Sequence, residues 1–177
     1  MDRLGFLSKG AGDMGMRIVA HDWAATPLGD TASWPSPLID ALKIAVLTQI
    51  PMYIVWGSEM TLLYNDAYAR ILGKRHPGAL GPAMPDVWRD EWAEIGPGIS
   101  QAMRGIASFE RDRPRLVASG EASELAYFTY SKIPIYGDDD SISGVFCTCQ
   151  DTTADVRLRQ SYQAESERLK DLFNQAP

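Results

Sequence analysis

Residues 52–72 read MYIVWGSEMTLLYNDAYARIL, and this stretch decides the fold of the chain. Met52–Trp56 and Thr61–Tyr64 are short runs rich in aromatic and aliphatic side chains, a composition that favours β-strands. Gly57–Ser58–Glu59 lies between the two runs and has the composition of a turn. The stretch therefore predicts a β-hairpin.

A short helix is predicted directly after this hairpin. Asn65 belongs to the residue types that cap helices, because its side-chain oxygen can accept a backbone N–H of the first turn. The helix is expected to cover Asp66–Leu72 and to end at Gly73, since glycine commonly closes helices.

Two helices are predicted before the hairpin. Ser36–Pro37 has residues that open helices, and the apolar spacing after it predicts an amphipathic helix ending near Gln49. Asp13 is expected to cap a shorter helix over Met14–Trp23. Met1–Gly12 is rich in glycine and is expected to be disordered. The apolar face of the longer helix comprises Leu38, Ala41, Leu42, Ala45 and Val46.

The chain after Gly73 is predicted to be helical at first and then rich in strands. Lys74–Asp86 carries several prolines and glycines and is expected to form loops and single turns. Apolar side chains in Val87–Ile95 have helical spacing, and a helix is expected to continue over Ile99–Arg104. The predicted strands are Ala107–Arg113, Tyr127–Ile135 and Ser143–Gln150, with a turn at Gly137–Asp140.

The order of these elements predicts the fold class. Two strands are followed by short helices, one longer helix and three more strands. This order indicates an α+β fold with a five-stranded antiparallel sheet and helices on one face.

The C-terminal segment has no strand character and predicts one more helix. Its apolar side chains recur at coiled-coil spacing, but Glu165 interrupts the series. A paired coiled coil and a solvated single helix are therefore both open interpretations. The apolar series comprises Leu158, Tyr162, Leu169 and Leu172.

Length, charge and hydropathy exclude several classes of protein. The chain has 177 residues and a net charge of -6, which suit one globular domain with appendages. No cluster of Lys and Arg stands out, so no nucleic-acid partner is expected. The N-terminus lacks a signal-peptide pattern, and the longest apolar-rich run, Ala41–Trp56, is interrupted by Lys43 and Pro51. We therefore expect a cytoplasmic segment without membrane contact.

Two motifs resemble those of the PAS family. Tyr64–Asn65–Asp66–Ala67–Tyr68 follows the second strand, where PAS domains typically have a helix capped by Asn. Gly144–Thr153 resembles the last strand of the family, and Asp151 and Thr153 match the Asp-x-Thr motif at its end. In relatives this motif joins the sheet to the output helix. The resemblance covers Pro51–Thr153 and implies the PAS fold.

The resemblance also implies a modular organisation. Residues 1–50 are similar to the N-terminal extension of PAS modules in bacterial sensor histidine kinases, residues 51–153 form the PAS domain, and residues 154–177 form a signalling helix. Leu169–Pro177 resembles the opening of a further PAS repeat, which implies a fragment of a longer protein. The alternative interpretation is a helix that ends before Pro177.

PAS sheets curve around a cavity that can hold a small molecule, so inward side chains are candidate ligand contacts. Counting alternate residues back from Asp151 predicts which strand side chains point inward, and helical side chains are expected to close the cavity. An open alternative is that the same side chains fill the core completely. The predicted pocket residues are Met52, Ile54, Trp56, Tyr68, Trp88, Trp92, Met103, Phe128, Tyr130, Val145, Cys147 and Cys149.

Several cofactors of the family lack their binding residues in this sequence. Covalent flavin photochemistry and coumarate attachment each need a cysteine in the middle of the domain, and none occurs between Asp66 and Arg104. Haem-binding members use a histidine on the longer helix, which Glu94–Arg104 does not contain, and His76 is expected in a loop. We predict no cofactor, and a non-covalent flavin or a small organic ligand remains open.

No residue pattern predicts catalysis or a metal site. Cys147 and Cys149 are interpreted as small buried hydrophobic side chains. Asp138–Asp140 is interpreted as a polar turn, because it lacks the spaced ligands of a calcium loop. Four further carboxylates have no His, Ser or metal partner in the sequence pattern and are interpreted as solvated charges. These are Glu91, Glu94, Glu110 and Asp112.

The sequence therefore predicts a non-catalytic input module that relays a ligand or partner signal to its C-terminal helix. The expected partners are a second copy of the chain and downstream PAS or kinase domains of the same protein. The main alternative is a ligand-free dimerisation or spacer module that uses the Leu38–Val46 helix and the C-terminal apolar series. A small enzyme on a similar curved sheet would need an Asp or His in the cavity, and the predicted pocket contains neither.

Overall fold

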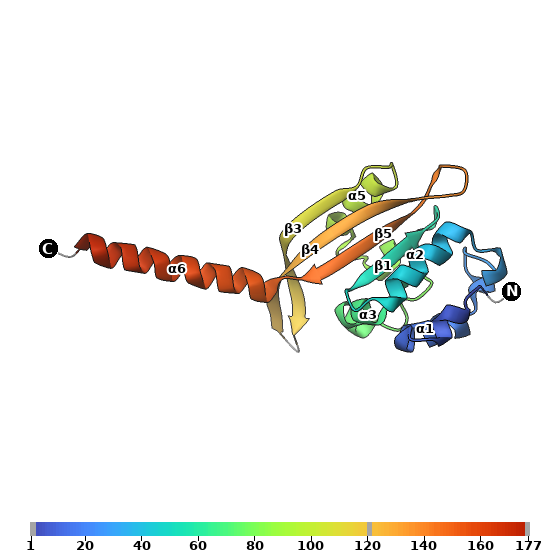
Figure 1. Ribbon diagram of the computed structural model, residues 1–177, viewed down its shortest axis with the longest axis horizontal. Helices are drawn as coiled ribbons and strands as arrows, with labels where there is room; N and C mark the ends of the chain where they lie inside the picture. Colours follow the sequence, from blue (N-terminus) through green and yellow to red (C-terminus); the bar gives the residue numbers. More distant parts are fainter. Residues whose placement is uncertain (1–2, 120–121, 176–177) are drawn as a thin grey trace. The chain divides into compact units, whose positions relative to one another are not determined.

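The computed structural model describes residues 3–119 and 122–175. Two compact units are present: Met1–Phe109 with Tyr130–Cys149, and Glu110–Thr129 with Gln150–Pro177. The helices are α1 (Gly12–Ala20), α2 (Ser36–Leu47), α3 (Asp66–Leu72), α4 (Met84–Val87), α5 (Trp92–Ala102) and α6 (Thr153–Gln175). The strands are β1 (Met52–Trp56), β2 (Thr61–Tyr64), β3 (Ser108–Ser119), β4 (Ala122–Tyr136) and β5 (Ile142–Asp151) (Figure 1).

The five strands form one sheet in the order β2-β1-β5-β4-β3. Strand β1 pairs antiparallel with β2 on one side and with β5 on the other. The predicted α+β class and five-stranded antiparallel sheet are confirmed. The predicted bounds of β1, β2 and α3 are also confirmed, because turn and cap residues mark both ends of each element.

Both faces of β1 and β2 are buried. Tyr53 lies opposite Cys147 of β5, and Ile54 lies opposite Phe146, so successive residues of β1 point to opposite faces of the sheet. Helix α2 packs against β1 (Figure 1), and α3 packs against it as well. A strand covered on both faces shows no alternation of apolar and polar residues.

The side chain of Asn65 joins α2, β1 and α3. Its Oδ1 accepts the backbone N–H of Met52 at 3.1 Å and that of Tyr68 at 2.9 Å. Its Nδ2 donates to the carbonyls of Ala45 at 2.9 Å and Ile50 at 2.7 Å. Asn65 is 1% exposed. Its hydrogen bonds therefore take the place of water in satisfying backbone N–H and C=O groups at the end of α2 and the start of α3.

The prediction of a disordered N-terminus is wrong over the described residues. Gly5–Ser8 forms a 3-10 turn, and Leu4 and Leu7 are buried. Arg3 donates a hydrogen bond to the carbonyl of Trp34, which is itself buried. The glycines had suggested flexibility, but burial of Leu4 and Leu7 favours an ordered segment.

The predicted cap of α1 is also wrong. Asp13 accepts a hydrogen bond from Arg17 on the surface of the same helix. The backbone N–H of Met14 instead donates to the carboxylate of Asp66, on α3, at 2.9 Å. A carboxylate suits a helix N-terminus, because it accepts a free N–H and faces the positive end of the helix dipole. Gly12 makes this approach possible, since a Cβ there would lie 1.7 Å from Asp66 Oδ2.

Helix α5 begins later than predicted. The expected helix over Val87–Ile95 is wrong as far as Glu91, because α4 ends at Val87 and the next helix runs from Trp92 through Pro97 to Ala102. Helix α2 begins at Ser36, as Ser36–Pro37 predicted, with Pro35 at the cap position. None of the described helices is long and apolar enough to cross a membrane.

We predict that Asn65→Asp lowers the free energy of unfolding by about 3 kcal/mol, because a carboxylate would face buried carbonyl oxygens and the donated bonds would be lost. Urea denaturation measures the change. Asn174→Asp, at an exposed position of α6, is the matched control and should change stability little. Equal stability of the Asn65 variant and the wild type would contradict the role of the amide.

Candidate ligand face and output junction

One face of the sheet carries a cluster of buried aromatic and thiol side chains. Tyr53, Tyr68, Cys147 and Cys149 are each at most 3% exposed. The rings of Tyr53 and Tyr68 lie 4.6 Å apart between β1 and α3. Because Tyr53 pairs with Cys147 across the strands, the two side chains share this face. We call this surface the tyrosine–cysteine face.

Three of the predicted pocket residues point away from this face. Met52, Ile54 and Trp56 pair with Thr148, Phe146 and Gly144, and residues that pair directly across two strands share a face. They therefore lie opposite Val145, Cys147 and Cys149, and the prediction that both sets face one cavity is wrong. Alternation fixes relative facing within a strand, whereas facing between strands depends on register, which the sequence did not supply. On β1, it is Tyr53 and Val55 that share a face with Cys147 and Val145.

The other predicted pocket residues lie on several elements. Trp88 directly follows α4, and Trp92 and Met103 lie at the two ends of α5, all half-buried. On β4, Phe128 is buried and Tyr130 is half-buried, with Phe128 in the second compact unit. Whether these side chains contact a ligand stays a prediction.

Burial raises the pKa values of three side chains on the tyrosine–cysteine face. Desolvation raises the pKa of Tyr53 and of Tyr68 well above 10.0, and it raises the pKa of Cys147 to about 12. A thiol is nucleophilic as the thiolate, so Cys147 is a poor nucleophile here. The interpretation of Cys147 and Cys149 as buried hydrophobic side chains agrees with their burial as free thiols.

The sequence interpretation missed a buried lysine near this face. Lys132 is 4% exposed, and its ammonium lies 5.0 Å from the ring centre of Tyr130. The Lys132 side chain lies over Gly98 of α5, where a Cβ would come within 2.8 Å of Nζ. The alternation that selected Phe128 and Tyr130 leads on to Lys132, so the signal was present in the sequence.

Glu91 is also more than a solvated charge. It forms an ion pair with Arg75 at 2.7 Å, and the Arg75 guanidinium stacks on Trp88 at 4.4 Å from the ring centre. The second carboxylate oxygen of Glu91 is buried and has no hydrogen-bond partner among the described residues. Through these contacts Arg75, which precedes α4, packs against Trp88 and Glu91, which follow α4.

The second unit contains the junction between β5 and α6. The carboxylate of Asp151 accepts the backbone N–H of Thr153 at 2.9 Å. The Thr153 hydroxyl accepts the backbone N–H of Tyr127 at 2.9 Å, and the N–H of Thr152 donates to the Tyr127 carbonyl at 2.8 Å. Asp151 thus caps the first turn of α6, and Thr152 and Thr153 attach that turn to Tyr127 of β4, a partner that sequence interpretation missed.

An ion pair adds a second attachment of α6 in this unit. Arg159 donates to the carboxylate of Asp112 on β3, and the N–H of Asp112 donates to the Thr129 hydroxyl. Asp112 has a φ of 50°, a conformation that is uncommon for residues other than glycine. A hydrogen bond from Thr152, followed by the interaction with Arg159, lowers the pKa of Asp112 below 3.8. The interpretation of Asp112 as a solvated charge is wrong.

Comparison with known proteins found solved structures with a similar fold. No protein-family model matches the sequence, and no curated protein matches it either. An RNA-binding light-oxygen-voltage receptor is similar to this chain at 14% identity, with a TM-score of 0.53. The likeness covers 83% of this chain and 42% of the receptor chain, so this chain spans less than half of that protein.

Two further solved structures are similar to shorter parts of the chain. A sensory box sensor histidine kinase from Vibrio cholerae is 18% identical, with a TM-score of 0.47, over 66% of this chain and 87% of the other. The PAS domain of BvgS from Bordetella pertussis is 20% identical, with a TM-score of 0.47, over 68% of this chain and 90% of the other. The strand order and the likeness to the light-oxygen-voltage receptor agree with the predicted PAS-like fold.

Proposed function

We propose that this chain is a non-catalytic input module of a bacterial signal-transduction protein, a histidine kinase. In this proposal, residues 1–50 form an extension, residues 51–153 form the sensing domain and residues 154–177 form the output helix. The observation that carries the proposal is the junction of Asp151, Thr153 and Tyr127, which attaches the start of α6 to a strand. The same strand β5 runs from Cys149 directly into this junction.

The proposed input is a small organic ligand, bound without a covalent link, or a protein partner. The buried aromatic and thiol side chains of the tyrosine–cysteine face support recognition of a largely apolar group. The high pKa of Cys147 argues against thiolate chemistry at this position. A non-covalent flavin stays among the candidate ligands.

The proposed output uses the exposed apolar series of α6. Leu158, Tyr162, Leu169 and Leu172 are between 48% and 70% exposed, so a second copy of the helix could cover them. Val156 is buried and Arg159 is paired with Asp112, so the opposite side of the first turns is already occupied. We propose that the chain acts as a homodimer and that downstream PAS or kinase domains of the same protein receive the signal.

A ligand-free dimerisation or spacer module is the second candidate. The close packing of Tyr53 and Tyr68 rings favours it, because side chains already occupy that part of the face. The Leu38–Val46 helix cannot pair as predicted, since its predicted apolar face is buried within one chain. Ile44, Leu47 and Ile50, which are about half exposed, would have to replace that face.

We expect Asp151→Ala to uncouple the signal from the output, because the carboxylate that fixes the Thr153 N–H is removed. The autophosphorylation rate of the full-length protein, with and without its signal, measures the coupling. Stability of the isolated chain should fall by about 1 kcal/mol, as for loss of a helix cap. Asp155→Ala, at an exposed position in the same turn, is the control. Wild-type regulation in Asp151→Ala would contradict the proposed coupling.

The Asp112–Arg159 pair should hold the first turns of α6 at neutral pH and release them in acid. The pKa of Asp112 is lowered in the folded state. The pair therefore stabilises the folded chain above pH 3.8, and this stabilisation is lost as the pH falls through the lower folded-state pKa of Asp112. The protection factors of amides 156–160, which are exchange rates corrected for the pH dependence of unstructured amides, should therefore fall in acid in the wild type. Asp112→Asn tolerates the same backbone conformation but lacks the charge, so the protection factors should already be low at pH 7.

Arg159→Gln should have the same effect as Asp112→Asn, and the double variant should add little, because both single changes remove one interaction. Additive effects of the two changes would show that the residues act separately.

Leu169→Glu should shift the chain from dimer to monomer, because a carboxylate would enter the proposed apolar contact. Analytical ultracentrifugation measures the association state. Gln163→Glu introduces the same charge at an exposed position outside the apolar series and should leave the dimer intact. A wild-type chain that is monomeric at all tested concentrations would rule out this helix as a dimer contact.

A further inference from the structure

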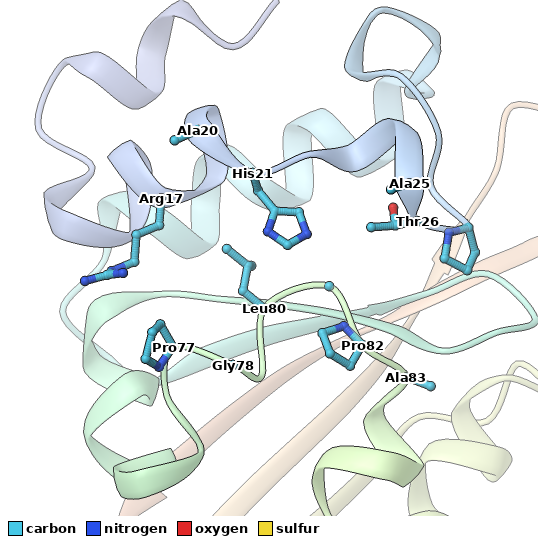
Figure 2. Close-up of a pocket in the computed structure, with 12 residues that line it drawn as sticks. Arg17, Ala20, His21, Ala25, Thr26, Pro77, Gly78, Leu80, Pro82 and Ala83 are labelled. Carbon is cyan, nitrogen blue, oxygen red and sulfur yellow. The ribbon is translucent and has the colours of Figure 1, made fainter.

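A groove of about 700 Å³ lies between the N-terminal extension and the loop Pro77–Ala83 (Figure 2). It shares no lining residue with the tyrosine–cysteine face or with the output junction. We propose that this groove binds a small organic acid, with one carboxylate and a compact apolar body. The proposal does not depend on the function proposed above.

The loop that forms one wall of the groove is fixed by backbone hydrogen bonds. The N–H of Gly81 donates to the Leu62 carbonyl at 3.0 Å, and the N–H of Leu62 donates to the Pro82 carbonyl at 3.0 Å. Pro77 and Pro82 restrict the loop further, because each proline fixes its own φ angle. The wall therefore exists before a ligand arrives, as in most small-molecule sites.

Helix α1 and the turn after it form the other wall, and the imidazole of His21 lies at its centre. Figure 2 shows this ring directed toward Leu80 across the groove. The ring packs on Trp23 at 4.3 Å between centres. Gly81, with a φ of +98°, leaves space for it, since a Cβ there would lie 2.6 Å from Nε2. No hydrogen bond reaches either ring nitrogen of His21 from residues 3–119 or 122–175.

Arg17 supplies a cationic group at one end of the groove. Its Nε donates to Asp13, while its two terminal nitrogens have no hydrogen-bond partner in the described part of the chain. In Figure 2 its side chain extends toward the Pro77 end, on the same wall as His21. A guanidinium offers paired N–H donors that match the two oxygens of a carboxylate.

The other lining residues determine how polar and how large the rest of the ligand can be. Most of it is apolar, with Ala20, Ala25, Leu80 and Pro82 among the contributors. A polyanion such as a nucleotide would bring several charges to a site with one guanidinium and one imidazole. The volume lies within the roughly 300–1,000 Å³ that is typical of small-molecule pockets. A monocarboxylate with an aromatic or branched aliphatic body fits both the charge and the walls.

The test uses 2-naphthoate as the probe, with 2-naphthamide as the neutral analogue of the same shape. Two-dimensional NMR of the whole chain follows the His21 ring and the Trp23 indole during each titration. We expect saturable shifts of both resonances with 2-naphthoate and at least tenfold weaker binding of 2-naphthamide, a difference of about 1.4 kcal/mol.

Three variants separate the proposed contacts from general effects on the chain. Arg17→Gln should weaken binding of 2-naphthoate about tenfold, as expected for loss of a charged hydrogen-bond donor. Arg70→Gln removes an exposed cation outside the groove and should not change binding. Ala25→Trp fills the groove from an exposed position and should abolish the shifts.

Absence of saturable shifts in the wild type would overturn the proposal. Equal binding of the acid and the amide, or unchanged binding in Ala25→Trp, would overturn it as well. Because the probes report directly on His21 and Trp23, failure here would leave the output junction and its own tests unaffected.

Discussion

The fold depends on one buried amide. Asn65 accepts two backbone N–H groups and donates to carbonyls at the end of α2 and in the segment that leads into β1. Without it, several polar backbone groups would be buried without partners, each at a cost of about 1–3 kcal/mol. The same residue therefore fixes where one helix ends, where β1 begins and where the next helix starts. Its neighbour Asp66 extends this arrangement to α1.

Local signals predicted the middle of the chain well, and tertiary contacts account for the failures. Strands β1 and β2 and helix α3 end at a turn, a cap and a glycine, so short-range sequence was enough to define them. The N-terminal segment has glycines that suggest disorder, but its leucines gain order through burial in the folded chain. The α5 start was missed because the helical spacing of Trp88 and Trp92 continues across a turn.

The candidate site was predictable only where its residues are neighbours in sequence. Asp151 and Thr153 were found because they lie in one motif at the end of β5. Asp112 and Arg159 were not, because a contact across 47 residues leaves no pattern in a single sequence. Met52, Ile54 and Trp56 were placed on the wrong face for a related reason: alternation within one strand does not determine its register with the next.

The attachment of α6 at Val156 and Arg159 determines the direction in which its apolar series points. An α-helix turns about 100° per residue, so Leu158 lies about 200° around the axis from Val156. Inserting or deleting one residue between Arg159 and Tyr162 would therefore turn the rest of the series by about 100° relative to this attachment, with only a small change in length. Seven residues would nearly restore its direction. An evolving or engineered fusion therefore has to preserve the direction in which this helix presents its apolar side chains, more than the length of the helix.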